Sequence, residues 1–189
     1  GYSADVLLRL MLFWGMFLPW GAVYSVDAAW NDNPPSSRQY LSLDTIAFAI
    51  QIISVYLFSV MLKSGKEWWS EGSAIYYALS IDYLATPIGK VVREAPYITL
   101  RLLNWSVLFL EVIAPLALLL PSKKASVRMG AVLGIVTLHL SISSVLFVGI
   151  FPLLGITGML FFLPGQSWDY LERKLVKASG AGIKIYYDD

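Results

Sequence analysis

Three side chains capable of acid–base chemistry lie in or beside long apolar runs of this sequence. Lys63 follows an apolar run, Glu111 lies in the middle of LFLEVIAP, and His139 lies in VTLHLSISS. Ionisable groups are costly inside a membrane, so each marks a candidate functional site by default. A lysine held away from water gives up its proton more readily, and a neutral amine can act as a general base. The three residues are therefore candidates for proton-transfer chemistry.

Lys63 also has a plainer interpretation. It opens the stretch KSGKEWWSEG, in which charged residues and two tryptophans directly follow the apolar run. Lysine stems reach from helix ends to the headgroups, and tryptophan rings prefer the membrane interface. Hydropathy alone therefore makes Lys63, with Trp68 and Trp69, an interfacial anchor. The alternative, a base, requires that its amine is turned into the protein.

The two mid-span residues have plainer interpretations as well. Glu111 has no neighbouring cation in sequence, so it is protonated, faces water, or pairs across helices with Arg9 or Arg101. The two arginines lie near helix ends and can instead extend to the headgroups. His139 is either a buried histidine bonded to another helix, a proton relay, or an axial ligand to haem or chlorophyll.

Composition places the chain in a membrane. It has 189 residues, of which 57% are hydrophobic and 14% charged, and its mean hydropathy is +0.64. Soluble domains carry about 25% charged residues. The net charge of +1, without a basic stripe, argues against nucleic acid as a partner. One histidine and no cysteine exclude a multi-histidine or thiolate metal centre built by this chain alone.

Four apolar segments alternate with polar turns, and a membrane span needs about 20 residues. The last segment, from Ala125 to Leu163, is too long for one span and is divided into two, the second short and either tilted or re-entrant. Pro19 and Gly21 predict a kink or early unwinding near the end of the first. The sequence thus predicts an all-α polytopic membrane protein with about five transmembrane or re-entrant helices. The segments are residues 6–26, 45–62, 97–120 and 125–163.

Shorter elements complete the prediction. Ser73 to Tyr83 is aromatic and amphipathic, which is typical of a short helix lying at the interface. After Pro164, DYLERKLVKAS predicts an amphipathic helix, and IKIYY alternates like the start of a strand. We therefore assign residues 1–165 to a transmembrane domain and 166–189 to an amphipathic tail and the start of a following domain.

Counts of lysine and arginine predict the orientation. If all five segments cross, one side of the membrane carries more basic residues, and the positive-inside rule places that side in the cytoplasm. The tail is then cytoplasmic and Lys63 faces outward, although a re-entrant last segment would remove the tail's four charges from this count. The richer side holds Arg38, Lys123, Lys124, Arg128, Arg173, Lys174, Lys177 and Lys184; the other holds Lys63, Lys66, Lys90 and Arg93.

Four stretches carry a resemblance to a known family. They are FLPWGAVYSVD, VYLFSVMLKSGKEWWSEGSAIYYAL, LFLEVIAPLALLLP and LHLSISSVLFVGIFPLLGITGMLFFLP. In order and spacing they resemble the HTTM (horizontally transferred transmembrane) family, which includes the vitamin K-dependent γ-glutamyl carboxylases. The resemblance covers nearly the whole chain and implies a helical protein of the bacterial inner membrane. GYSAD resembles a turn that follows earlier transmembrane helices in the family, and IKIYYDD resembles the first strand of the thiol-disulfide oxidoreductase-like domain that often follows it.

The resemblance also implies roles for single residues. In the carboxylases, the lysine matching Lys63, with a one-residue offset before Trp69, is the base that deprotonates vitamin K hydroquinone. Reaction with oxygen then yields a stronger base, which takes a proton from the γ-carbon of a peptide glutamate before CO₂ adds. The segment that lies against the quinone matches Gly1 to Asp5, which holds no histidine, so the resemblance speaks more to the fold than to carboxylation. The implied catalytic residues are Lys63, His139 and Glu111, and the implied cofactor-binding residues are Asp27, Trp68, Trp69 and His139.

Two functions of different classes remain open. The first is an enzyme-like core with a quinone- or lipid-type pocket, in which Lys63 is the base and points between helices. The second is a non-catalytic transmembrane subunit of a larger complex that carries pigments, haems or quinones, which requires extensive contacts to other transmembrane chains. A transporter ranks third, because no paired repeats with broken helices are evident. Membrane lipids are partners in each case.

Overall fold

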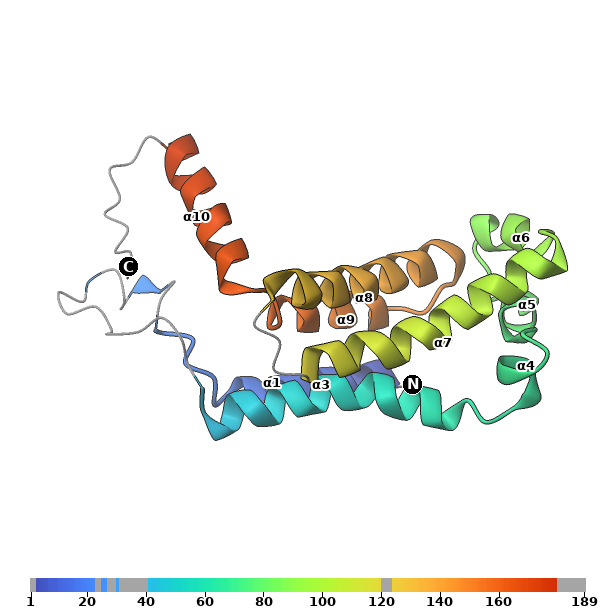
Figure 1. The fold of residues 1–189 in the computed structure, drawn as a ribbon, viewed down its shortest axis with the longest axis horizontal. Helices are drawn as coiled ribbons and strands as arrows, with labels where there is room; N and C mark the ends of the chain where they lie inside the picture. Colours follow the sequence, from blue (N-terminus) through green and yellow to red (C-terminus); the bar gives the residue numbers. More distant parts are fainter. Residues whose placement is uncertain (1–2, 23–24, 27–29, 31–40, 120–123, 180–189) are drawn as a thin grey trace.

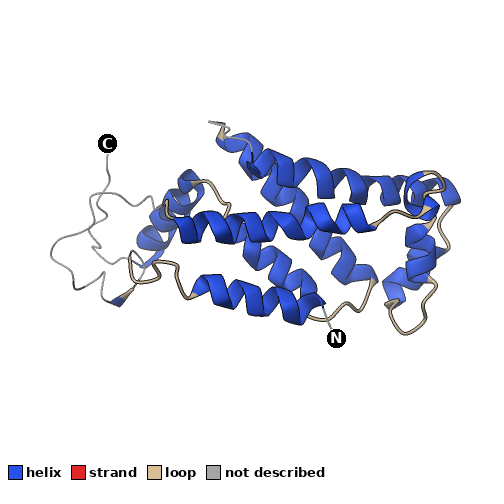
Figure 2. Cartoon of the chain, turned by 90° about the horizontal axis from the view of Figure 1, so that it is seen from below, coloured by secondary structure: helices blue, strands red, loops and turns tan. Residues whose placement is uncertain are grey.

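The computed structural model describes residues 3–22, 25–26, 30, 41–119 and 124–179. Among these residues every regular element is a helix, and the longer helices lie side by side in an elongated bundle (Figures 1 and 2). Three are long and apolar enough to cross a membrane: α3 (Leu43–Leu62), α7 (Tyr97–Leu119) and α8 (Ala125–Val145). At 1.5 Å per residue they are about 30 Å long, the thickness of the hydrocarbon core. The prediction of an all-α polytopic membrane protein is confirmed.

The helix α3 begins at a capping box. The Ser42 hydroxyl accepts from the Thr45 backbone N–H, and the Thr45 hydroxyl accepts from the Ser42 N–H. These bonds satisfy backbone groups that a helix start leaves unpaired. From this start α3 packs against α7, and α7 packs against α8. The cap therefore fixes where α3 begins, and packing on α7 positions its later residues.

The short second half of the last apolar segment is α9 (Phe151–Leu160). Gly149, in the left-handed region at φ 63°, turns the chain after α8, and Pro152 occupies the first turn of α9, where its missing N–H is tolerated. The helix has 10 residues, about 15 Å, which is half a membrane span. It packs back along α8, and its length confirms that the second part of the last apolar segment is short.

The first segment differs from its prediction as a span over residues 6–26. Its helix, α1 (Ser3–Gly15), has 13 residues and is followed by turns. The Trp20 indole donates a 2.5 Å bond to the Gly15 carbonyl, and Pro19 disfavours helical geometry in the residue before it. The helix therefore ends well before Pro19. It packs against α3 and α9.

Short helices close one end of the bundle (Figure 1). They are α4 (Lys66–Trp69), α5 (Ala74–Leu79) and α6 (Pro87–Arg93). The interfacial helix expected over residues 73–83 is thus the six-residue α5, while α6 was not predicted. The Thr86 hydroxyl caps α6 and also donates to the Ser144 carbonyl at 2.7 Å, which ties α6 to the end of α8.

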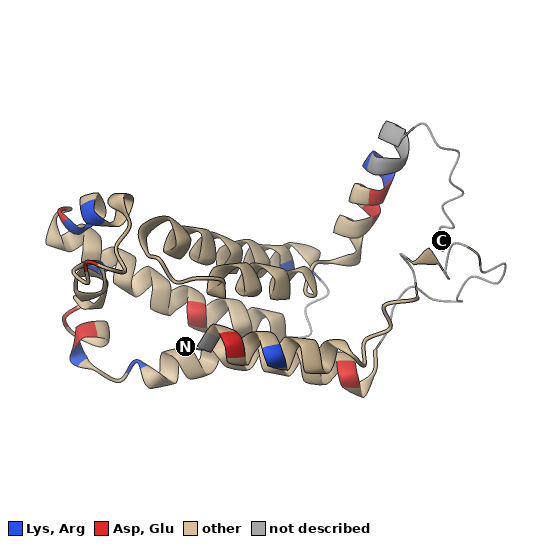
Figure 3. Ribbon diagram, turned by 180° about the vertical axis from the view of Figure 1, so that it is seen from behind, with Lys and Arg blue, Asp and Glu red and all other residues tan. Residues whose placement is uncertain are grey.

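The helix α10 (Gly165–Ser179) projects from the opposite end. Figure 3 shows that charged residues gather at this helix and around α4–α6, while the middle of the bundle carries few. The strand expected over residues 183–187 lies outside the described residues. Between the two ends, the apolar core joins α1, α3, α7, α8 and α9. Its buried members are Leu7, Phe48, Ile52, Ile53, Tyr56, Ala114, Leu118, Ala131, Val132, Ile135, Leu138, Leu154, Met159 and Phe162.

Candidate functional site

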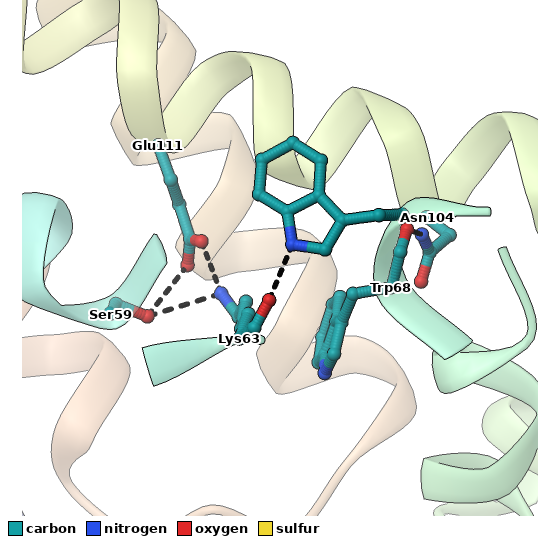
Figure 4. Close-up of polar contacts among 6 residues, drawn as sticks. Ser59, Lys63, Trp68, Asn104 and Glu111 are labelled. Carbon is teal, nitrogen blue, oxygen red and sulfur yellow. Dashed lines mark hydrogen bonds and ion pairs between the residues drawn. The ribbon is translucent and has the colours of Figure 1, made fainter. Parts of the chain in front are cut away.

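Lys63 turns back into the bundle from the end of α3 and forms an ion pair with Glu111 of α7 (Figure 4). Ser59 bridges the pair: its hydroxyl accepts from Lys63 Nζ at 3.1 Å and donates to Glu111 Oε1 at 3.3 Å. The Lys63 and Glu111 side chains are only 15% and 9% exposed. The amine is therefore held between helices and does not extend toward the headgroups as an anchor would.

Helical spacing explains why these groups meet. Tyr56, Ser59 and Lys63 are three and four residues apart, so they lie on one face of α3. That face packs on α7, where Glu111 is buried near mid-helix. Ser59, Lys63 and Glu111 are called the lysine cluster below.

Trp68 covers the lysine cluster from the side of α4. Its ring centroid lies 4.8 Å from Lys63 Nζ, within range of a cation–π contact. The indole of Trp69 donates a 2.5 Å bond to the Lys63 carbonyl. Trp68 is half-buried and Trp69 is 52% exposed. The Trp68 ring therefore lies against the amine, while the Trp69 indole holds the Lys63 backbone at the protein surface.

A row of donors on α7 holds α4 in place. The last carbonyls of a helix lack intrahelical partners, and those of α4 are satisfied by side chains of α7. Tyr97, Arg101 and Asn104 are four and three residues apart and share one face of α7, and Trp105 follows Asn104 at the edge of that face. The four bonds run from Tyr97 to the Glu71 carbonyl (2.5 Å), from Arg101 to Ser70 (3.2 Å), from Asn104 to Trp68 (2.8 Å) and from Trp105 to Trp69 (3.3 Å).

These four bonds, called the α4 clamp, depend on a close approach at Gly72. Its φ of 70° lies in the left-handed region, and a Cβ there would lie 2.5 Å from the Arg101 Cγ. Only glycine meets both conditions without strain. Asn104, at the centre of the clamp, is fully buried. The clamp fixes the position of Trp68 and thereby the cover over Lys63.

His139 belongs to a second polar site, with Tyr56. The Tyr56 hydroxyl and His139 Nε2 are joined by a 2.9 Å hydrogen bond, and both side chains are buried. Phe151 packs edge-on against the imidazole at 5.6 Å. A Cβ on Gly155 would lie 2.0 Å from His139 Nε2, so α9 can pass the ring only because residue 155 is glycine.

The space beside His139 is small. A cavity of about 10 Å³ borders His139 and Tyr56, which is room for about one water molecule. A porphyrin does not fit there. Its lining residues are Leu7, Ile52, Val55, Tyr56, His139, Phe151, Leu154 and Gly155. This geometry matches a buried histidine bonded to another helix.

The predicted site residues thus separate into groups. Lys63 and Glu111 come together, with the two tryptophans beside them, whereas His139 bonds to Tyr56 instead. The partner of Glu111 is Lys63 and not an arginine: Arg101 belongs to the α4 clamp, and Arg9 is exposed on α1. Asp27 lies outside the described residues.

Sequence reasoning missed Ser59, Tyr56 and Asn104. A usable signal existed for the first two, since they precede Lys63 by one and two helical turns on a single face. Asn104 was also visible as an amide inside an otherwise apolar span. The contacts of the α4 clamp could not be predicted, because their acceptors are backbone carbonyls, which carry no signal in the sequence.

Comparison with known proteins gives one match. The family model for the HTTM domain matches residues 5–168, which include all the residues of the lysine cluster and of the α4 clamp. No curated protein and no solved structure matches the chain.

Proposed function

This chain belongs to the HTTM domain family and is an integral membrane protein, and we propose that its lysine cluster takes a proton from a quinone- or lipid-type ligand. One observation carries the proposal. A lysine at the end of a membrane span ordinarily extends its amine to the headgroups, whereas Lys63 points inward to Glu111 and Ser59. In that arrangement the amine gives up its interaction with the headgroups, and a catalytic role for the amine would explain why it points inward.

The cluster contains the parts that a buried base needs. When the Glu111 carboxylate accepts a proton from Lys63, the amine becomes neutral and can take a proton from a ligand hydroxyl. In that step an N–H bond forms on Lys63 and the ligand O–H bond breaks. Glu111 keeps the proton that it accepted, and the new ammonium lies against the Ser59 hydroxyl and the Trp68 ring, both of which stabilise a positive charge.

The residues present suit an aromatic ligand with an acidic hydroxyl. The indole faces of Trp68 and Trp69 offer a stacking surface beside the amine. A hydroquinone, when bound, supplies such a hydroxyl and the electrons for a reaction with oxygen, as the resemblance to the carboxylases implies. The cavity at His139 is too small for a quinone ring. We therefore assign the approach to Lys63 itself, past the half-exposed Trp69.

The test compares Lys63 variants of the whole chain in lipid nanodiscs. Lys63→Arg keeps the positive charge and its pairing with Glu111, but a guanidinium stays protonated and cannot act as a base. We expect Lys63→Ala and Lys63→Arg each to lower quinol-dependent oxygen consumption at least 100-fold, within the range for loss of a general base. Lys66→Ala, at an exposed lysine three residues away, is the matched control and leaves the rate unchanged.

Two results would contradict the proposal. The first is turnover by Lys63→Arg at the wild-type rate. The second is a wild-type protein that neither binds quinones, by quenching of tryptophan fluorescence, nor turns them over, which would favour the non-catalytic subunit. A carboxylase- or epoxidase-like reaction further predicts a quinone epoxide among the products, detectable by chromatography and absent with Lys63→Ala.

A further inference from the structure

The helix α10 is amphipathic and projects from the bundle (Figure 1). At 3.6 residues per turn, positions 168, 171, 175 and 178 lie on one side, and their residues are Trp, Leu, Leu and Ala. Positions 169, 173 and 177 lie on the other side and are all charged. Trp168 and Leu171 are 38% and 43% exposed. These two apolar side chains are thus left partly uncovered by the described part of the chain.

A helix as short as α10 is stable only when its apolar side packs against another surface. Isolated helices of about 15 residues are only marginally stable in water, and α10 has 15 residues. Burying a large apolar side chain contributes about 1.5–3 kcal/mol. The apolar side of α10 must therefore be covered for the helix to persist.

The position of α10 identifies what covers it. It follows α9 after the buried Phe162, and α9 runs back along α8, so α10 starts at the end of the bundle where α8 begins. Since α8 is a candidate membrane span, its first residue, Ala125, marks one edge of the hydrocarbon layer. Figure 1 shows α10 running across the long axis of the bundle. A helix in this place and direction lies along the membrane surface.

We propose that α10 lies on the bilayer, with Trp168 and Leu171 inserted below the headgroups and Arg173 and Lys174 against the phosphates of anionic lipids. Interfacial helices combine tryptophan and leucine on one side with basic residues on the other. Arg173 and Lys174 are both exposed, and Lys174 lies over the ring of Tyr170 at 5.2 Å, an aromatic residue suited to the interface. This inference is independent of the chemistry at Lys63.

The absence of cysteine from the chain allows a sharp test. Single variants Leu171→Cys and Arg173→Cys place a nitroxide label on opposite sides of α10 in the full chain. In nanodiscs that contain anionic lipid, collisions with oxygen report burial in the bilayer, and collisions with a water-soluble nickel complex report exposure to water. We expect the label at position 171 to favour oxygen by at least fivefold relative to the label at 173.

If the apolar side of α10 faces water or protein instead of lipid, the two labels give different results. Two labels that both favour the nickel complex would show a helix free in water. A label at 171 that is shielded from both reagents would show packing against protein, either a partner or the bundle itself. Each of these results overturns the proposal.

Lipid charge supplies a second measurement. With Leu171→Cys as the reporter, the oxygen preference should rise when anionic lipid is added to zwitterionic nanodiscs. The additional substitutions Arg173→Gln and Lys174→Gln should remove most of that rise and leave the bundle folded, since both residues are exposed. A rise of equal size in their presence would contradict the contact with phosphates.

Discussion

The two buried polar sites along α3 differ in chemistry and in closure. The lysine cluster contains two opposite charges and lies at the end of the helix, beneath a tryptophan cover. The pair of Tyr56 and His139 lies deeper, beside a cavity of about 10 Å³, sufficient for about one water molecule. A ligand from the membrane can be admitted only where side chains can move aside. The comparison therefore favours the proposal that ligand chemistry belongs to the lysine cluster and that the tyrosine–histidine pair serves helix packing.

The two sites are also held differently. The cover of the lysine cluster depends on four bonds from side chains of α7 to backbone carbonyls at and beyond α4, which act locally. His139 depends on the close passage of α9 at Gly155, which involves two packed helices. Changes in the α4 clamp should therefore act on a short segment, and changes at His139 should act on the bundle.

The largest effect on stability is expected at Glu111, because the charge of Lys63 would remain buried without its partner. Glu111→Leu should lower the free energy of unfolding by about 3 kcal/mol, the range seen when one member of a buried pair is removed. Unfolding of the purified protein by sodium dodecyl sulfate in mixed micelles measures this change.

The double variant Lys63→Met/Glu111→Leu is the control. Two apolar side chains of similar volume avoid the unpaired charge, so most of the lost stability should return. A double variant as unstable as the sum of the single ones would mean that Lys63 and Glu111 are not coupled. The lysine cluster would then not differ from the tyrosine–histidine pair by a stabilising pair of charges.

A smaller loss is expected for Gly155→Ala. The added Cβ would lie 2.0 Å from His139 Nε2, and overpacking of this kind costs about 2 kcal/mol. Gly130→Ala on α8 is the matched control, because a Cβ there meets no atom within 4 Å. The same unfolding experiment should find this control unchanged or slightly more stable, since alanine favours a helix. Equal losses of stability in both variants would contradict the close contact between α9 and the His139 ring at Gly155.

Tyr56→Phe should cost about 1 kcal/mol. The ring remains, but the 2.9 Å bond to His139 is lost, and side-chain hydrogen bonds between membrane helices are worth about 0.6–1.7 kcal/mol. The control is Tyr83→Phe, at a side chain that is 80% exposed, for which no change is expected. If Tyr56→Phe matches its control, the tyrosine–histidine bond does not contribute to the packing of α3 on α8.

Most of the fold follows from the sequence, because apolar length is a local property. The predicted spans over residues 45–62, 97–120 and the first part of 125–163 correspond to α3, α7 and α8. Pro19 and Gly21 predicted an early unwinding of the first segment, but the helix ends sooner, at Gly15, where the Trp20 indole reaches back to the carbonyl. The helix α6 was missed because it is short and is held by contacts with α8.

The charged members of the candidate site were predictable, but their pairing was not. Lys63 and Glu111 were found because charges are rare in apolar segments, but they are 48 residues apart, and only the packing of α3 on α7 brings them together. Hydropathy favoured Lys63 as an interfacial anchor, because a hydropathy profile describes the length and composition of a segment and not the direction of a side chain. His139 was grouped with them for its chemistry, while its spatial partner proved to be Tyr56.

The smallest and most local effect is expected for Asn104→Leu, which removes the central bond of the α4 clamp. Asn104 Oδ1 is buried without a partner among the described residues, so leucine also removes an unpaired acceptor, and the global stability should change by less than about 1 kcal/mol. The amides of Ser70 and Glu71, which bond to the Lys66 carbonyl, should exchange with deuterium about tenfold faster, because local opening of α4 becomes easier. Ser106→Ala, whose hydroxyl bonds only within α7, should leave their exchange unchanged. Faster exchange spread equally over α7 and α8 would show instead that α4 and the cover over Lys63 do not open as a separate local unit. The cover would then open only with the bundle that also holds His139.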